Sequence, residues 1–313
     1  MARFVMQRVL GAVPVLLLVT LITFALMRLI PGDPSAALGG LSATPQERDQ
    51  IRHDLGLDQP YSVQLVRWYA DLARGHLGRS ILLGQDVLDA TLERLPVSLS
   101  ISAYSMVLTL AFGIIGGVLA ALRQNSWVDQ ATMMLAMVGI SMPSFWIGLM
   151  MIVLFSVHLG WLPTGGYVNF TDDPWQWLRA ATMPAISLAL LQMGLLTRIT
   201  RSTMLEVLRQ DYVRTARAKG LPERTVIVKH GLRAALTPIL TIFGLDLGLL
   251  VGGAILTEVT FSLHGLGYFT IQAIQNQDFP EIMGVVLLAA FLIVIANMIV
   301  DILYSAVDPR VRR

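Results

Sequence analysis

The chain alternates between long runs of hydrophobic residues and shorter polar stretches. A helix needs roughly 20 predominantly apolar residues to cross the hydrocarbon core of a bilayer, and six runs approach or exceed that length. They lie at about residues 9–30, 97–122, 131–157, 183–199, 236–257 and 282–307. The pattern predicts an all-α, polytopic membrane protein with six transmembrane helices.

The polar segment at residues 31–96 is too long and too patterned to be a simple turn. Thr44-Pro45-Gln46-Glu47 has the form of a capping box with proline at the first helical position. Two further short helices are predicted at 61–74 and 87–94, because a glycine or a proline that stops a helix follows each of them. We therefore expect a small helical insertion between the first and second spans.

Composition agrees with a membrane protein. Of the 313 residues, 55% are hydrophobic and 14% are charged, and the mean hydropathy is +0.65, which is too apolar for an ordinary soluble domain. The chain has no cysteine, which excludes a disulfide, a thiol nucleophile and a cysteine-ligated metal. It also has no Gly-x-x-x-x-Gly-Lys-Ser/Thr sequence, so we expect no loop that binds nucleotide phosphates.

The lysines and arginines predict the orientation in the membrane. If the N-terminus is cytoplasmic, 15 of the 23 basic residues lie on the cytoplasmic side. Most of the other eight belong to the insertion, where the positive-inside rule is weakest. An even number of spans then places both termini in the cytoplasm. The expected parts are the first span within 1–30, an extracytoplasmic insertion at 31–96, and a core at 97–313 with a cytoplasmic loop at 209–235.

One polar stretch, QDYVRTARAKGL at residues 210–221, stands between two hydrophobic runs. Asp211 can cap a short helix there, and Gly220 can end it in the left-handed conformation before Pro222. A short helix at the membrane surface, with small and basic side chains interleaved, suits docking into the groove of a partner. These side chains are Arg214, Ala216, Arg217, Ala218 and Lys219. On charge alone, an ordinary basic cytoplasmic loop is the alternative.

This stretch resembles the coupling loop of permeases from binding-protein-dependent ABC importers. Most such loops read Glu-Ala-Ala, three variable residues and Gly. Here Ala216 and Gly220 keep the spacing, whereas Arg214 and Thr215 replace the Glu and the first Ala. The dipeptide/oligopeptide branch is more similar, since its members show an Asp-Tyr-x-Arg-Thr-Ala-Arg-Ala-Lys-Gly run.

Other motifs of that branch are spread over nearly the whole chain. They are Pro31-Gly32-Asp33-Pro34, Leu55-Gly56-Leu57-Asp58-Gln59-Pro60, Leu77-Gly78-Arg79-Ser80, Met142-Pro143-Ser144-Phe145-Trp146, Gly253-Ala254-Ile255-Leu256-Thr257-Glu258 and Asp308-Pro309-Arg310-Val311-Arg312. Two departures lie outside the short helix predicted at 210–221: Leu263-His264 stands where relatives have Trp-Pro, and Ala234 stands where they have Asn.

The resemblance implies the type I ABC importer permease fold and the first (B-type) permease of a di-/oligopeptide importer in the bacterial cell membrane. It implies a second, homologous permease, two ABC ATPases below, an extracytoplasmic binding protein that delivers peptide, and surrounding membrane lipid. ATP and Mg would be bound by the ATPases, so we expect no cofactor, no enzymatic activity and no nucleic-acid partner for this chain. The residues implied to couple to the ATPases are Asp211, Tyr212, Arg214, Thr215, Ala216, Arg217, Ala218, Lys219, Gly220 and Leu221.

Polar side chains inside the predicted spans are costly in lipid, so a functional role is the first hypothesis for each. Gln192, Asp246 and Asn297 lie in the fourth, fifth and sixth runs and are candidates to line a translocation pathway. A carboxylate at Asp246 could meet the amino group of a substrate. The alternative is a hydrogen bond from Asp246 to a neighbouring helix or a partner subunit.

Two other classes of function compete with a transport subunit. A stand-alone channel or ion-coupled carrier predicts repeated halves or several paired charges within the membrane, and neither is evident. A membrane-embedded hydrolase needs catalytic groups at one depth. The five histidines instead fall on different loops without metal-ligand spacing. We therefore favour a permease with no catalytic site and no metal site.

Overall fold

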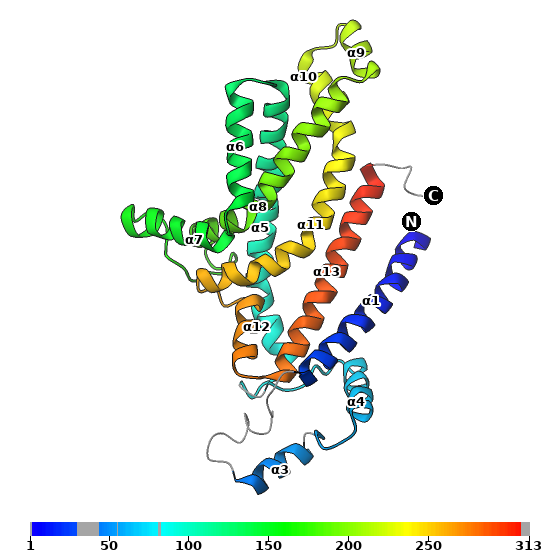
Figure 1. Ribbon diagram of the computed structural model, residues 1–313, viewed down its shortest axis with the longest axis vertical. Coiled ribbons are helices and arrows are strands. Elements are labelled where there is room, and N and C mark those ends of the chain that lie inside the picture. Colours follow the sequence, from blue (N-terminus) through cyan, green and yellow to red (C-terminus); the bar gives the residue numbers. More distant parts are fainter. Residues whose placement is uncertain (1, 30–43, 55, 81–82, 308–313) are drawn as a thin grey trace. The chain divides into compact units, whose positions relative to one another are not determined.

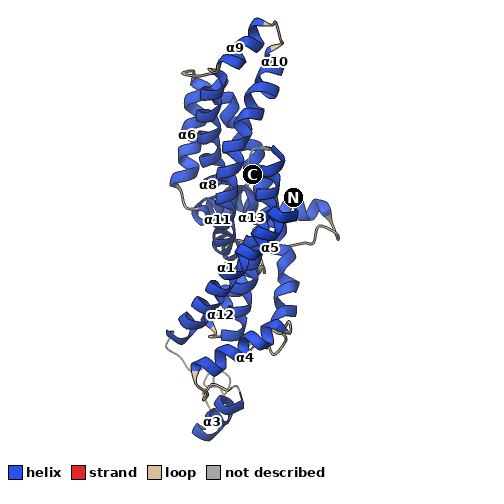
Figure 2. Ribbon diagram, turned by 90° about the vertical axis from the view of Figure 1, so that its right-hand side faces the viewer, coloured by secondary structure: helices blue, strands red, loops and turns tan. Residues whose placement is uncertain are grey.

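The structure is a computed structural model, and it describes residues 2–29, 44–54, 56–80 and 83–307 (Figure 1). Within these ranges the side chains at 2–9, 27–29, 51, 54, 240–242, 244–253 and 299–307 are not described. The described part is helical, and its only β pairing is an isolated antiparallel bridge between Arg79 and Asp86 (Figure 2).

The helices follow the hydrophobic runs closely, with shorter helices between them. They are α1 (Ala2–Leu29), α3 (Pro45–Asp54), α4 (Tyr61–Ala73), α5 (Val87–Leu122), α6 (Trp127–Ser141), α7 (Ser144–Met151), α8 (Pro174–Leu208), α9 (Asp211–Ala218), α10 (Glu223–Thr225), α11 (Arg233–Thr260), α12 (Leu266–Gln275) and α13 (Phe279–Val307). Two π-helical segments, Ile152–His158 and Val226–Leu232, continue α7 and precede α11.

Among the described residues, three helices are long and apolar enough to cross a membrane, namely α5, α8 and α13. A fourth candidate is the pair formed by α6 and the helix over Ser144–His158, which is bent by 106° at a short break. The described apolar part of α1, Leu10–Leu26, is shorter than a full span. The helical, multi-span character predicted from the sequence is therefore confirmed, while the number six stays a prediction.

Pro96 and Pro143 have opposite effects on the helices around them. We predicted separate helices at 87–94 and 97–122, and this was wrong, because α5 runs through Pro96 as one helix of 36 residues. Membrane helices tolerate an internal proline when neighbouring groups satisfy the freed carbonyl. The run at 131–157 forms a bent pair of helices, α6 and Ser144–His158, instead of one continuous helix, and the pair still counts as one candidate span. Met142 is extended there (φ −97°, ψ 135°), as the residue before a proline prefers, and Pro143 starts α7.

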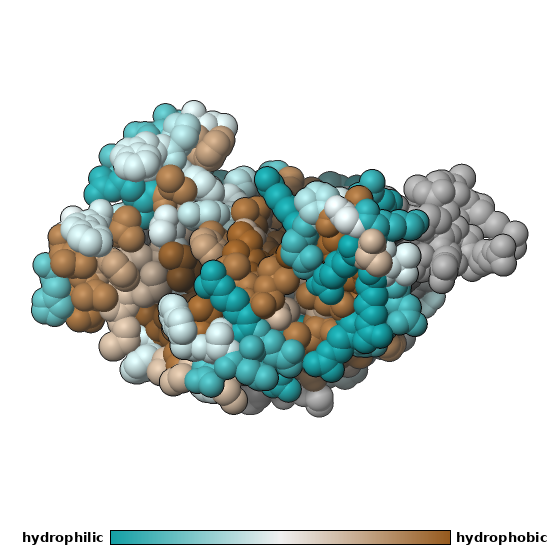
Figure 3. All heavy atoms as spheres, turned by 90° about the horizontal axis from the view of Figure 1, so that it is seen from above, coloured by the Kyte–Doolittle hydropathy of each residue, from teal (hydrophilic) through white to brown (hydrophobic). Residues whose placement is uncertain are grey.

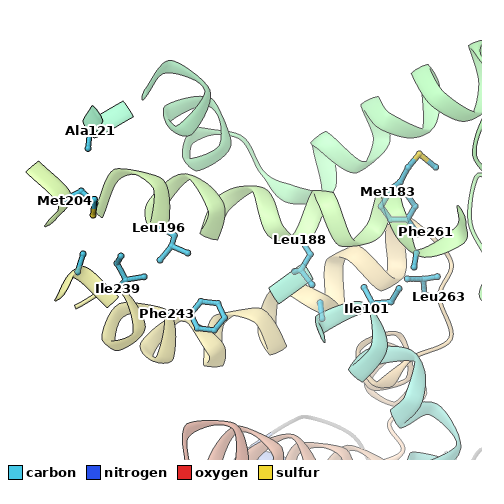
Figure 4. Close-up of a cluster of buried hydrophobic side chains, with 13 residues drawn as sticks. Ile101, Ala121, Met183, Leu188, Leu196, Met204, Ile239, Phe243, Phe261 and Leu263 are labelled. Atoms are coloured by element: carbon cyan, nitrogen blue, oxygen red, sulfur yellow. The ribbon is translucent and has the colours of Figure 1, made fainter. Parts of the chain in front are cut away.

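The chain forms two compact units. One comprises Val97–Leu263 with Ile295–Arg313, and the other comprises Ala2–Pro96 with His264–Val294. In the first unit, α8 packs between α6 and α11, and buried side chains of α5, α8 and α11 meet in one cluster that includes Ile101, Leu188, Leu196 and Phe243 (Figure 4).

Small residues allow α5 and α8 to approach closely. Every fourth residue of α5 is buried in this unit: Ile101, Ser105, Thr109, Gly113, Gly117 and Ala121. A Cβ at Gly117 would lie 2.7 Å from the backbone oxygen of Thr197, and one at Gly113 would lie 2.9 Å from Leu196 Cδ2. This is the close helix contact that small residues permit in membranes.

The second unit holds the N-terminal helices and the start of α13. The predicted capping box forms: the Thr44 N–H donates to Glu47 Oε2 (2.7 Å), and the Glu47 N–H donates to Thr44 Oγ1 (3.3 Å). Helix α12, which the hydrophobic pattern did not predict, contributes Leu266 and Phe269 to a small core with Ala90 and Val285. At ten residues, α12 is too short to appear as a membrane run.

Candidate coupling helix and buried polar groups

Helix α9 is the short helix predicted at the polar interruption, and it joins the end of α8 to α10 (Figure 1). The predicted cap was wrong by one residue. Gln210 occupies the N-cap without a side-chain hydrogen bond, and Asp211 is the first helical residue. There its carboxylate lies 3.5 Å from Arg214 Nη1, and a negative charge in the first turn complements the helix dipole.

The end of α9 is a Schellman motif, as the glycine predicted. Gly220 has a φ of +72°, a left-handed conformation that costs little for glycine. Its N–H donates to the Arg217 carbonyl at 2.9 Å, and the Leu221 N–H donates to the Ala216 carbonyl at 3.4 Å. The helix is therefore stopped by its own backbone, and Pro222 begins the next helical turn.

Two side chains fix α9 to the rest of the chain. Val213 (0% exposed) and Ala216 (5%) pack with Val226 and with Leu208 at the end of α8. Val213 was not among the residues singled out from the sequence, although its apolar character, three positions before Ala216, was the available signal.

The remaining predicted coupling residues point away from this contact. All nine are exposed: Asp211, Tyr212, Arg214, Thr215, Arg217, Ala218, Lys219, Gly220 and Leu221. Figure 3, a view from above relative to Figure 1, shows hydrophilic and hydrophobic side chains interspersed on that face. One helix of eight residues thus has a narrow buried edge and a broad free surface.

An ion pair closes the loop that follows α9. Arg217 Nη2 donates to Glu223 Oε1 at 2.8 Å, and Arg217 Nε donates to Glu223 Oε2 at 3.2 Å. The hydrogen bonds from this guanidinium hold the pKa of Glu223 below its ordinary value, and the carboxylate raises the pKa of Arg217. Both groups are solvent-exposed, so the pair defines loop geometry more than it adds stability.

A second ion pair lies at the start of α6 and was not predicted. Arg201 Nη2 donates to Asp129 Oδ2 at 2.7 Å and Arg201 Nε donates to Oδ1, while the Asn125 N–H donates to Oδ2 at 2.9 Å. The Asp129 side chain is 5% exposed. A bidentate pair of this kind joins α8 to the first turn of α6.

The three candidate pathway residues are not brought together among the described side chains. Gln192 is 2% exposed within α8, one turn before Leu196 in the α5–α8 contact. Asn297 is exposed on α13. Asp246 lies in α11, but its side chain falls outside those that the structure describes. In the same described part, no group of three or more His, Asp or Glu side chains is placed to hold a metal ion.

Comparison with known proteins identifies relatives over the whole chain. Residues 113–313 match the family described as binding-protein-dependent transport system inner membrane component, and residues 1–102 match the N-terminal model of such membrane components. A protein of Brucella abortus (strain 2308), named as a peptide transport system permease protein, is 48% identical over 312 residues, which cover 100% of this chain and 99% of the relative.

Relatives with more specific names are also similar over full length. The dipeptide transport system permease protein DppB of Alkalihalophilus pseudofirmus is 39% identical and covers 100% of both chains. The oligopeptide transport system permease protein AppB of Bacillus subtilis is 40% identical and covers 99% of both. Among solved structures, a chain of the MetNI methionine ABC transporter in an inward-facing conformation matches with a TM-score of 0.57 at 18% identity, covering 71% of this chain and 97% of that one. At this identity the match shows the fold, which is the predicted type I importer permease fold.

Proposed function

Because the chain belongs to the family of binding-protein-dependent transport system inner membrane components and is a permease subunit of a peptide ABC transporter, we propose that it forms one half of an ATP-driven import pathway for di- or oligopeptides. The other half is a second, homologous permease. Two ABC ATPases dock on the cytoplasmic side, and an extracytoplasmic binding protein delivers peptide. ATP and Mg are bound by the ATPases, since the sequence has no phosphate-binding loop.

In this proposal the chain is a multi-pass inner-membrane protein with six spans and cytoplasmic termini. The distribution of lysine and arginine supports that orientation, with residues 31–96 outside and the loop at 209–235 inside. Gln192, Asp246 and Asn297 remain candidates for the pathway.

The observation that carries the proposal is the two-sided character of α9. Helix α9 is attached to the neighbouring segments by one buried edge, and the rest of its side chains are exposed, so a partner can contact it from the other side. The exposed set includes Tyr212 (47%), Arg214 and Arg217, and tyrosine and arginine are enriched among the residues that dominate binding at protein interfaces. The buried set, Val213 and Ala216, connects α9 to α8 and to the segment before α11. A rigid-body movement of a docked ATPase can therefore reach two spans.

Two alanines on opposite faces of α9 provide the test. Ala218→Glu changes only the exposed face, whereas Ala216→Glu places a charge in the buried contact. Ala234→Glu makes the same change at an exposed alanine outside α9. Each full-length variant would be purified in mild detergent with its partner permease and the ATPases.

We expect Ala218→Glu to lose the ATPases while the Ala234→Glu control retains them, both with the thermal stability of the wild type. Retention of the ATPases by Ala218→Glu at the level of the control would contradict docking through this face. If no ATPase co-purifies with the wild type, and the purified chain alone moves solute into liposomes, the chain is a channel or carrier instead.

A further inference from the structure

Three buried polar side chains of the second unit meet where α13 begins. Ser80, Asp278 and Glu281 are 2%, 0% and 0% exposed. Ser80 Oγ lies 2.6 Å from Asp278 Oδ2 and 3.0 Å from Glu281 Oε2. Glu281 Oε1 is also buried and has no hydrogen-bond partner. Two carboxyl groups therefore converge on one hydroxyl in a place that water does not reach.

The local backbone explains why Glu281 turns toward Ser80. Asp278 and Glu281 stand at the spacing of a capping box, and Asp278 Oδ1 accepts the Glu281 N–H at 3.2 Å. In the usual box, the Glu side chain reaches back to the N–H of the capping residue. Here the Asp278 N–H already donates to the Ala273 carbonyl at 2.9 Å, at the end of α12. Glu281 is thus free to bond across to the segment that contains Ser80.

Counting hydrogens assigns the charge states. A serine hydroxyl has one hydrogen to donate and two lone pairs that accept. The Leu83 N–H donates to Ser80 Oγ at 2.9 Å, and the Ser80 hydrogen at 2.6 Å goes to Asp278. An ionised Glu281 would then face the remaining lone pair of Ser80 at 3.0 Å and the neighbouring Asp278 carboxylate, and both contacts would be repulsive. A protonated Glu281 donates into that lone pair, and the Ser80 hydroxyl then makes all three of its hydrogen bonds.

Other charges near the cluster agree with this assignment. Asp278 is placed to carry the negative charge, since it accepts N–H and O–H donors at the N-terminus of α13. The positive charge of Arg94, on α5, favours an ionised Glu281. However, the guanidinium of Arg94 has other contacts: it donates a hydrogen bond to the Ala90 carbonyl at 2.6 Å, and it lies 4.0 Å from the centre of the Phe269 ring. Helix α12 contributes no acidic or basic side chain.

We propose that Glu281 is a proton-binding site. Held neutral, it donates a hydrogen bond to Ser80 and fastens the segment at residues 77–80 to the start of α13. The contact joins parts of the chain that are 201 positions apart. Gly78 lies next to Pro280, since a Cβ atom added to Gly78 would be 3.3 Å from Pro280 Cβ. Loss of the proton replaces a donated hydrogen bond with a buried, unpaired charge. The contact between residues 77–80 and the start of α13 is therefore strong when Glu281 is protonated and weak when Glu281 is ionised.

Infrared spectroscopy of the purified full-length chain tests the charge state directly. A protonated carboxylic acid gives a carbonyl band above the amide band, and that band shifts in heavy water. At about pH 7, where ordinary glutamates are ionised, we expect one such band in the wild type. It should be missing in Glu281→Gln and unchanged in Glu93→Gln, which alters an exposed carboxylate of α5 in the same unit. A wild-type spectrum without the band, or a band that persists in Glu281→Gln, overturns the proposal.

Thermal stability provides a second readout that a purely structural role would not move. The amide of Glu281→Gln still donates to Ser80 but cannot ionise. Between about pH 5 and about pH 9, the wild-type unfolding midpoint should fall relative to that of Glu281→Gln, by roughly 2–4 °C or more. Equal pH profiles for the two proteins would also overturn the proposal. If Glu281→Gln does not fold, Ser80→Ala replaces it, with the expectation that the carbonyl band moves because the acceptor is gone.

Discussion

The contact between α5 and α8 allows a quantitative test of the helix packing in the first unit. Ordinary contacts of a Cβ lie at 3.4–4 Å, whereas a Cβ at Gly117 would lie 2.7 Å from Thr197 O and 2.7 Å from Thr200 Cγ2. One of these atoms belongs to the backbone, so a rotamer change cannot remove the overlap. Overpacking of this kind costs about 1–3 kcal/mol, and alanine recovers about 1 kcal/mol through its helix propensity. Because the overlap involves backbone, we take the upper end and expect Gly117→Ala to lose about 2 kcal/mol.

Gly11→Ala is the matched control, because a Cβ at Gly11 meets nothing within 4 Å. It should be neutral or stabilising by up to about 1 kcal/mol. The assay is thermal unfolding followed by tryptophan fluorescence, in one detergent, for the wild type and both variants. A loss of about 2 kcal/mol corresponds to an unfolding midpoint roughly 4–8 °C lower. A Gly117→Ala midpoint at or above that of the wild type would show that α5 and α8 do not approach as closely as described.

Three further predictions concern the end of the same unit at which α9 lies. Val213→Ala removes buried methyl groups beneath α9 and should cost about 1–3 kcal/mol of packing; we expect lower transport-stimulated ATP hydrolysis with the ATPases still bound in pull-down. Because Arg217 lowers the pKa of Glu223, their pair is fully formed above the ordinary glutamate pKa of 4.5 and is lost as the pH falls through the lowered value. Limited proteolysis of this loop should then accelerate in acid, and Glu223→Gln should remove that dependence. Asp129→Asn leaves Arg201 without its charge partner and should cost about 3 kcal/mol in thermal unfolding, whereas adding Arg201→Met should recover part of that loss.

Short sequence patterns correctly predicted the structural elements that depend only on neighbouring residues. The capping box at Thr44 and the left-handed Gly220 are both present, because each depends on residues within a few positions. The apolar runs predicted α5, α8 and α13 as spans. About 20 consecutive apolar residues are enough to identify a span, whichever helix packs against it. The N-cap of α9 was misplaced by one residue because Gln210 and Asp211 are both compatible with a helix start.

Prolines show where local rules stop being sufficient. Pro96 and Pro143 carry the same intrinsic restriction, yet α5 continues through the first and the helix breaks at the second. Proline removes one backbone hydrogen bond of a helix at either position. Whether the helix continues past the proline depends on tertiary contacts, which the local sequence does not contain. The same limit applies to the polar pairs. The residue types at Asp129 and Glu281 were visible, but their partners lie 72 and 201 positions away.

The stiffness of α9 also follows from how it is attached. Burial of Val213 contributes only about 2 kcal/mol, so side-chain packing alone would not transmit a large displacement. The backbone contributes more, since α9 follows α8 after Arg209 and Gln210, and its Schellman end leads within a few residues to Pro222 and α10. A displacement of α9 must then either carry the end of α8 and the segment before α11 with it, or expose Val213 and Val226 to water. Since the second outcome loses buried apolar area without any compensating contact, movement of the attached spans is the favoured response to a docked partner.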